Sequence, residues 1–531
     1  MASMLHAALI LAALLALSVQ TATATQLSGS TTEWPSLLFN FTIKRSSMKV
    51  HGQSEFSMYA NPIASSRADS VLYDVFATFT EDSTLYNYTL INGVAHSTST
   101  PYSGNPSDDV KPTPTVSCVD AESSKLPDIN AIVSALNGAT ATPKSNDITC
   151  ASGNLFKVTV YGIDFALCAS GSAGFIMHGS DMDIDVEFLE SPIDIVVPTQ
   201  KDKTECKKIA SASSVTVTSK GLLTGQQFSD KARHLKAAMS FSFRDKSTCS
   251  CKSTPRPCVF IHGLGVKDEM PENQDEFTDY WGKYLAGHGP CCSSMKFAHL
   301  NTVNSTWTDA ILQGKVCNRA LTASNTSKDS VISDTIVVTH SMGNVMFAGA
   351  LSTAKCRLDS SSTWVGMAGP MFGSMCSDFV QDSCAGKTNI VWEKIGNITG
   401  RCPPNTGLKS LAYEGGSYSS QASDEAYKAA QEVYRTNVSA LMCGKSSSGL
   451  VSKYQSQFWG LSMMVPHKSK LNDGMVEFQS CAAGFPESKF GANYRDRFYV
   501  TKLNHYDMQF RAGDSLLDEE KMPLKWFDCL L

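Results

Sequence analysis

The sequence predicts two parts of different fold class, a β-rich N-terminal domain over residues 26–245 and an α/β domain over residues 258–531. Between about 32 and 197, most segments alternate apolar and polar residues, which is typical of strands with one solvent-facing side. After residue 258, short apolar runs alternate with helical stretches, and this order indicates a parallel sheet. A chain of 531 residues is also too long for one core of ordinary size.

In the N-terminal part, the alternation is clearest in four segments, 71–79, 85–93, 155–168 and 175–189. One helix is expected, over residues 128–139 (DINAIVSALNGA). We therefore expect a mainly antiparallel sheet with few helices. Its strand pattern resembles the curved half-barrel sheets of lipoprotein-carrier and ependymin-like lipid-binding domains.

Residues 246–257 are polar, carry two cysteines and end in prolines, so they are expected to form a linker. In the part that follows, apolar strands are expected at 258–265, 335–339, 362–370 and 497–503, and helices at 277–286 and 423–442.

The composition excludes some classes of partner and cofactor. The formal net charge is −5 and no basic run is present, so the sequence gives no reason to expect nucleic acid as a partner. The chain has no pair of C-x-x-C units with zinc-like spacing and no glycine-rich phosphate loop. We therefore expect neither a metal nor an organic cofactor.

The N-terminus is typical of a secretory leader. An apolar block at 5–18 is followed by the small residues Thr21-Ala22-Thr23-Ala24, so residues 1–24 are expected to be a signal peptide and the mature protein to be secreted. Six N-x-S/T sequons agree with this route and predict a glycoprotein; they begin at Asn40, Asn87, Asn304, Asn325, Asn397 and Asn437.

The chain contains 17 cysteines, which in a secreted protein predicts disulfide bonds. Cys291 and Cys292 are adjacent and are expected to bond to different partners, because disulfide geometry disfavours neighbours. The odd total leaves at least one free thiol or an intermolecular bond.

A candidate nucleophile lies in residues 335–345, TIVVTHSMGNV. A strand, a tight turn and a helix here would hold the hydroxyl of Ser341 above the sheet edge, beside the positive end of the helix dipole. Gly343 would allow strand and helix to approach closely, and Thr339 stands where this turn usually has glycine. By itself, the T-x-S-x-G pattern also fits an ordinary turn.

Three further motifs favour catalysis. The turn FIHGLG (260–265) could present the backbone N–H of Leu264 to an oxyanion, with the N–H of Met342 as second donor. Asp473 lies in LNDGMV and His505 in LNHYDM, after a late strand. These residues are the candidate carboxylate and base. Among the other acids, Asp378 and Asp382 are the main alternatives to Asp473, and Asp496 and Asp507 are further candidates.

The order Ser341, Asp473, His505 is that of α/β-hydrolases, and residues 255–531 resemble that superfamily, in particular its lipase-like members. The stretch HSMGN is similar to the nucleophile region of lipases and of proteins like GPI inositol-deacylase and lecithin:cholesterol acyltransferase. The resemblance implies an α/β hydrolase fold, with helices on both faces of a mostly parallel sheet. It also implies an acyl-enzyme mechanism in which Ser341 attacks an ester, His505 is base and then acid, and Asp473 holds the imidazole tautomer.

The stretch from about 371 to 470 is long for one crossover, so a cap insertion is expected there. Two interpretations of it stay open: disulfide-stapled loops that pack on themselves, or a cap with Met463 and Met464 among the residues lining an apolar pocket. Such a cap would favour hydrophobic or lipid-like esters and peripheral contact with a membrane surface. Two other functions remain open: acyl transfer to an alcohol by the same triad, and a non-catalytic lipid-binding or interaction protein.

Overall fold

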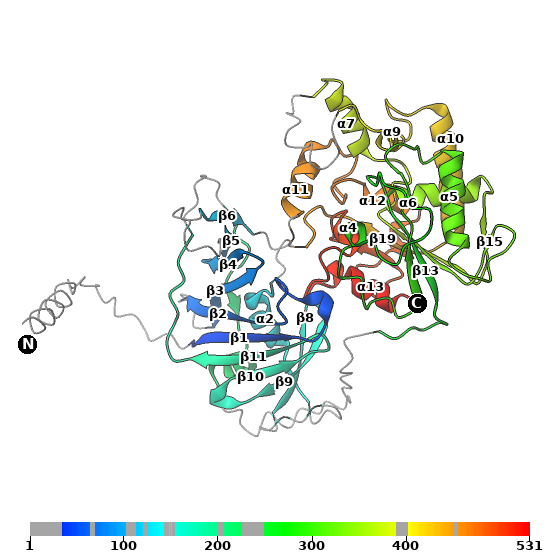
Figure 1. Cartoon of the computed structure of the whole chain (residues 1–531). Helices are drawn as coiled ribbons and strands as arrows, with labels where there is room; N and C mark the ends of the chain where they lie inside the picture. The colour runs from blue at the N-terminus through cyan, green and yellow to red at the C-terminus, as the bar shows by residue number, and fades with distance from the viewer. Residues whose placement is uncertain are drawn as a thin grey trace, which may run out of the picture. The chain divides into compact units, whose positions relative to one another are not determined.

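The chain folds into two large β-sheets, one antiparallel and one parallel, which Figure 1 shows in a computed structural model. The structure describes residues 34–531 except 64–68, 102–112, 120–125, 143–147, 149, 151–153, 199–205, 226–248, 389–401, 451 and 453. The expected signal peptide, residues 1–24, lies outside the described residues. Residues Trp34–Leu531 form a single structural unit.

The N-terminal sheet has twelve strands and every neighbouring pair is antiparallel, as the alternation predicted. The strand order is β6-β5-β4-β3-β2-β1-β11-β10-β9-β8-β7, with β12 paired to β3. The strands are β1 (Ser36–Ile43), β2 (Glu55–Ile63), β3 (Ser70–Glu81), β4 (Thr84–Ile91), β5 (Val94–Pro101), β6 (Thr115–Cys118), β7 (Thr140–Ala141), β8 (Leu155–Val160), β9 (Ile163–Ala169), β10 (Phe175–His178), β11 (Met182–Leu189) and β12 (Ser213–Ser214).

Alternate residues of these strands form the core. In β1, Leu37, Phe39, Phe41 and Ile43 are buried. In the described part of this region, two α-helices accompany the sheet, α2 (Ile129–Ala135) and α3 (Val217–Thr224). The first is the expected helix, and it begins where the Asp128 carboxylate accepts hydrogen bonds from the N–H groups of Asn130 and Ala131.

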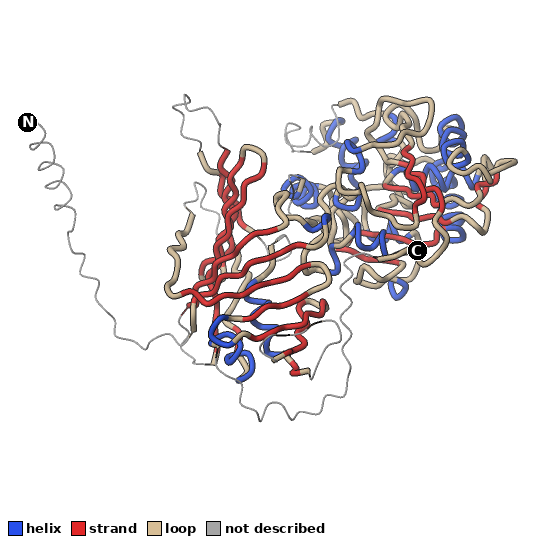
Figure 2. Tube along the Cα trace, turned by 60° about the horizontal axis from the view of Figure 1, so that its bottom comes forward, coloured by secondary structure: helices blue, strands red, loops and turns tan. Residues whose placement is uncertain are grey.

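The second sheet has six parallel strands in the order β14-β13-β16-β18-β19-β20. They are β13 (Arg256–Ile261), β14 (Cys292–Phe297), β16 (Ile336–His340), β18 (Thr363–Met367), β19 (Val438–Gly444) and β20 (Phe498–Thr501). Its helices include α4 (Thr278–Trp281), α5 (Ala310–Leu321), α6 (Met342–Ser352), α7 (Met375–Cys384), α9 (Thr406–Lys409), α10 (Gln421–Asn437), α11 (Gln455–Met464), α12 (Phe478–Ala482) and α13 (Pro523–Cys529). Figure 2 shows these strands enclosed by helices and loops.

Both faces of the parallel sheet are buried, which explains why its strands are continuously apolar. Along β16, Val337 belongs to a core that includes residues of α5, α6 and α10. Ile336 and Val338 belong to a second core on the other face, with Trp281 of α4 and residues of α13. This second core also contains most of the buried apolar residues of the antiparallel sheet, so it is shared by the two sheets.

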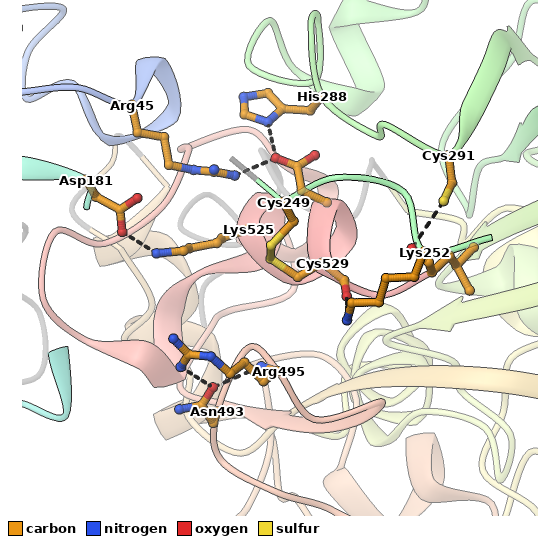
Figure 3. The surroundings of a disulfide bond; sticks show 12 residues. Arg45, Asp181, Cys249, Lys252, His288, Cys291, Asn493, Arg495, Lys525 and Cys529 are labelled. Atoms are coloured by element: carbon orange, nitrogen blue, oxygen red, sulfur yellow. Dashed lines mark hydrogen bonds and ion pairs between the residues drawn. A yellow bond between two sulfur atoms is a disulfide. The ribbon is translucent and has the colours of Figure 1, made fainter. Parts of the chain in front are cut away.

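A buried ionic cluster lies where the two sheets share this core. Arg45, just after β1, contacts the carboxylates of Asp528 at 2.5 Å and Asp514 at 3.4 Å. Asp528 also accepts a hydrogen bond from His288, at 2.8 Å, and Lys525 pairs with Asp181 (Figure 3). The same region is closed by the disulfide between Cys249 and Cys529.

All seventeen cysteines are described, and sixteen form disulfides, which confirms the prediction of disulfide bonds. Cys291 and Cys292 bond to different partners, Cys251 and Cys258. The remaining thiol, Cys376, is free and buried. The other pairs are Cys118–Cys206, Cys150–Cys168, Cys249–Cys529, Cys317–Cys356, Cys384–Cys402 and Cys443–Cys481.

Three expected elements differ from the structure. The helix expected at 277–286 is only the short α4, because Gly282 takes a positive φ of 73° and ends it. The helix expected at 423–442 ends at Asn437, and β19 follows at once. Because β19 is an inner strand of the parallel sheet, residues 371–470 are not one continuous cap insertion.

Candidate active site

Ser341 occupies the turn between β16 and α6. Its backbone has φ 54° and ψ −129°, a conformation that is costly for a residue other than glycine. The helix starts at the next residue, Met342, so the Ser341 side chain lies at the positive end of the α6 dipole. The strand, the tight turn and the helix that the sequence predicted are therefore present.

The residues around the turn explain its sequence. A Cβ atom on Gly343 would lie 2.6 Å from the carbonyl oxygen of Ile261 and 2.8 Å from that of His262, so only glycine lets α6 approach β13 this closely. Thr339 Oγ1 donates a hydrogen bond of 2.7 Å to Asn344 Oδ1 and accepts one of 2.8 Å from Trp364 Nε1. A threonine at this position thus anchors the turn by side-chain contacts.

Asn344 is a residue whose role the sequence did not indicate. Its Nδ2 group donates to the carbonyl oxygens of Ser341 at 3.1 Å and Met367 at 2.9 Å. Because Asn344 is fully buried and also bonds Thr339, it ties the serine turn to both β16 and β18.

The structure brings Ser341, His505 and Asp473 into one line of hydrogen bonds. His505 Nε2 lies 2.9 Å from Ser341 Oγ, and His505 Nδ1 lies 2.8 Å from Asp473 Oδ2. The three residues are 8%, 2% and 1% exposed, so these contacts are shielded from bulk water. This arrangement can move a proton from the serine hydroxyl to the imidazole while the carboxylate fixes the Nδ1–H tautomer.

The loop that carries Asp473 holds its carboxylate in place. Oδ1 accepts hydrogen bonds from the N–H groups of Met475, at 2.9 Å, and Val476, at 2.7 Å. The backbone N–H of His505 donates to the carbonyl oxygen of Asp473 at 3.0 Å. The Asn-Asp-Gly turn is therefore bonded to the histidine loop through main chain as well as side chain.

The other acids are engaged elsewhere. Asp378 Oδ1 accepts from the Tyr413 N–H at 2.9 Å, and Asp382 Oδ1 accepts from the Tyr418 hydroxyl at 2.7 Å. Asp507 binds the N–H of Leu450, and Asp496 binds that of Asn493. Of these five carboxylates, Asp473 is the one that forms a hydrogen bond with the His505 ring.

The turn after β13 lies against the serine. A Cβ atom on Gly263 would lie 2.5 Å from Ser341 Cβ, so only glycine fits at this position. No hydrogen bond joins the N–H groups of Leu264 or Met342 to another group in the described part of the chain. Both N–H groups are therefore free to serve as donors to an oxyanion.

The neutral ring of His262 stabilises this turn through two hydrogen bonds. Its Nδ1 donates to the carbonyl oxygen of Gly263 at 2.8 Å, and its Nε2 accepts the N–H of Leu300 at 2.9 Å. Burial lowers the pKa of His262 to about 4, which agrees with a neutral ring. Thr302 Oγ1 adds a second hydrogen bond to the Gly263 carbonyl, at 2.9 Å.

An apolar cluster lies beside the three aligned residues. Its members include Leu264, next to Gly263, Met475, two residues after Asp473, and Tyr506, next to His505. The remaining members come mainly from α7, α9 and α11: Met375, Cys376, Phe379, Val380, Cys384, Leu408, Tyr454, Phe458, Leu461, Met464 and Val465. Met464 belongs to this cluster, whereas Met463 is 68% exposed and points to solvent.

No group of His, Cys, Asp and Glu side chains that could hold a metal ion is found among the described residues. Within the described ranges, no helix has both the length and the apolar character needed to cross a membrane. A comparison of the chain with protein-family models found no matching family, and a search of the curated proteins found no match.

Proposed function

We propose that this protein is a serine hydrolase that cleaves carboxylic esters of lipid-like molecules through an acyl-enzyme. The proposal includes an α/β-hydrolase architecture for residues 258–531. The observation that carries it is the pair of hydrogen bonds that links the three side chains. Ser341 Oγ lies 2.9 Å from His505 Nε2, and His505 Nδ1 lies 2.8 Å from Asp473 Oδ2. A nucleophile bonded to a base, and a base bonded to the group that orients it, is the geometry by which a serine triad is recognised.

In the first half of the reaction, Ser341 Oγ attacks the ester carbonyl while its proton passes to His505 Nε2. The oxyanion accepts hydrogen bonds from the N–H groups of Leu264 and Met342. His505 then gives the proton to the leaving alkoxide, and the alcohol departs. The serine is left as an acyl ester.

In the second half, water enters, His505 takes one of its protons, and the hydroxide attacks the acyl carbonyl. Collapse of this second oxyanion breaks the bond to Ser341, which recovers its proton from His505. Asp473 stays ionised throughout and stabilises the imidazolium. No step requires a metal or an organic cofactor.

The apolar cluster supports a hydrophobic ester as the substrate class. Leu264, Met475 and Tyr506 each lie beside one component of the proposed site, so an acyl chain placed near Ser341 would meet apolar side chains. Eight disulfides and the expected leader support a secreted protein, and we propose contact with lipid surfaces on the same grounds.

The experiment is hydrolysis of p-nitrophenyl esters of increasing chain length by the full chain and by Ser341→Ala. We expect longer acyl chains to be preferred over acetate, and the substitution to lower kcat by about 10⁴-fold or more. Equal rates for the two proteins would refute the proposal and leave a non-catalytic lipid-binding role. Adding a competing alcohol separates the reactions, because an acyltransferase would yield a new ester instead of the free acid.

A further inference from the structure

Beyond the three aligned residues, a second line of hydrogen bonds joins the turn after β13 to the loop that carries His505. It runs through Tyr280 of α4 and His340, the residue before Ser341. Gly263 N–H donates to the Tyr280 hydroxyl at 2.7 Å, and that hydroxyl lies 2.8 Å from His340 Nδ1. His340 Nε2 lies 3.0 Å from the carbonyl oxygen of His505. Tyr280 and His340 are both buried.

The direction of each hydrogen bond follows from the two ends of the line. A carbonyl oxygen can only accept, so His340 Nε2 must carry the proton that it shares with His505. Nδ1 of a neutral imidazole is then an acceptor and takes the Tyr280 O–H. The Tyr280 oxygen is left to accept the Gly263 N–H.

The surroundings keep both groups in these states. Burial, together with the nearby His505 ring, holds the pKa of His340 well below its usual range. Burial raises the pKa of the Tyr280 hydroxyl, so it keeps its proton. The amide of Gln509 also lies 3.5 Å from His340 Nδ1, and this side chain offers a further donor.

The line has two consequences for the site. It occupies the N–H of Gly263, so that group is not available to an oxyanion, whereas the N–H of the next residue, Leu264, stays available. It also connects three segments far apart in sequence, the turn at 263, the end of β16 and the loop at 505. Each bond is buried, so a missing partner would leave an unsatisfied polar group.

We infer that Tyr280 and His340 are positioning residues, which fix the oxyanion turn and the histidine loop relative to Ser341. The inference rests on the proposed hydrolase function. Neither side chain touches the reacting atoms. Their effect is on how closely the Leu264 N–H and the His505 ring approach their working positions, where a shift of about 1 Å can cost about 100-fold in rate.

The test compares Tyr280→Phe with Tyr499→Phe in the full chain. Tyr499 is a matched control, because its buried hydroxyl also accepts a backbone N–H, from Met522, and donates to a neighbour, the Glu519 carbonyl. With p-nitrophenyl butyrate, we expect Tyr280→Phe to lower kcat about 10- to 100-fold with KM changed less than about twofold. Tyr499→Phe should keep kcat within about twofold.

A second measurement does not depend on turnover. In hydrogen exchange, Tyr280→Phe should speed exchange in peptides that contain Gly263 or His505, and Tyr499→Phe should not. If the wild type hydrolyses the ester and both variants match it in kcat and exchange, the positioning role is overturned and the proposed function stands. If the wild type neither hydrolyses esters nor reacts with a fluorophosphonate, both proposals are overturned.

Discussion

At the scale of single residues, Ser341, Asp473 and His505 could be selected from the sequence because each sits in a short, recognisable turn. Their order along the chain then suggested that they meet. The side chains that support them have no such local signature. Tyr280 and His340 are 60 residues apart, and an isolated Tyr or His gives no sign of a distant partner. Asn344 is the exception, because it lies only five residues after Thr339. The threonine that stands there in place of the usual glycine could have indicated a polar partner nearby in the sequence.

Replacing the candidate acid tests the assignment directly. In Asp473→Asn, the side chain can still accept the N–H groups of Met475 and Val476, but it no longer holds the Nδ1–H tautomer of His505. We expect kcat for p-nitrophenyl butyrate to fall by about 10³- to 10⁴-fold. Asp382→Asn is the control, since that carboxylate binds Tyr418 and Lys387, and its kcat should stay within about twofold. Loss of activity in the control alone would show that the wrong acid was assigned.

At the scale of elements, local periodicity predicted the type of most strands and of α2, but boundaries depended on packing. The helix expected from 423 begins at Gln421, because Ser420 and Ser423 form a reciprocal cap that was not predicted from the sequence. It stops at Asn437, because the apolar residues that follow pair with β18 and β20. The order of strands in the parallel sheet is set by long-range pairing and has no local signal.

Two glycine substitutions in neighbouring helices separate close packing from helix propensity. Gly343→Ala in α6 places a Cβ atom against backbone carbonyls that cannot rotate away, so we expect the free energy of unfolding to fall by about 1–3 kcal/mol. Gly314→Ala in α5 meets no atom within 4 Å and should raise it by about 0.5–1 kcal/mol. Urea unfolding measures both. A neutral or stabilising Gly343→Ala would contradict the close approach of α6 to β13.

At the scale of the whole molecule, the change from an antiparallel to a parallel sheet was predictable, because the period of the apolar residues changes along the chain. The connection between the sheets was not. Arg45 contacts residues more than 460 positions away, and its neighbours in sequence give no indication of those partners. The pairing of Cys291 and Cys292 with different cysteines was predictable from geometry alone, whereas the identity of each partner was not.

The buried cluster at Arg45 predicts a large effect of one substitution. Arg45→Leu leaves the carboxylates of Asp514 and Asp528 buried without their cation, so we expect the free energy of unfolding to fall by about 3–5 kcal/mol. The adjacent Lys44 pairs with Asp183 nearer the surface, and Lys44→Leu should cost less than about 1 kcal/mol. Similar losses in the two variants would argue against a structural role for the cluster.

The central claim is that Ser341 is a nucleophile activated by His505, and a fluorophosphonate probe tests it most directly. Intact-mass measurement followed by peptide mapping of the labelled chain should show one adduct, on the peptide that contains Ser341, and Ser341→Ala should show none. Absence of labelling in the wild type, or an adduct on a different residue, would contradict the account.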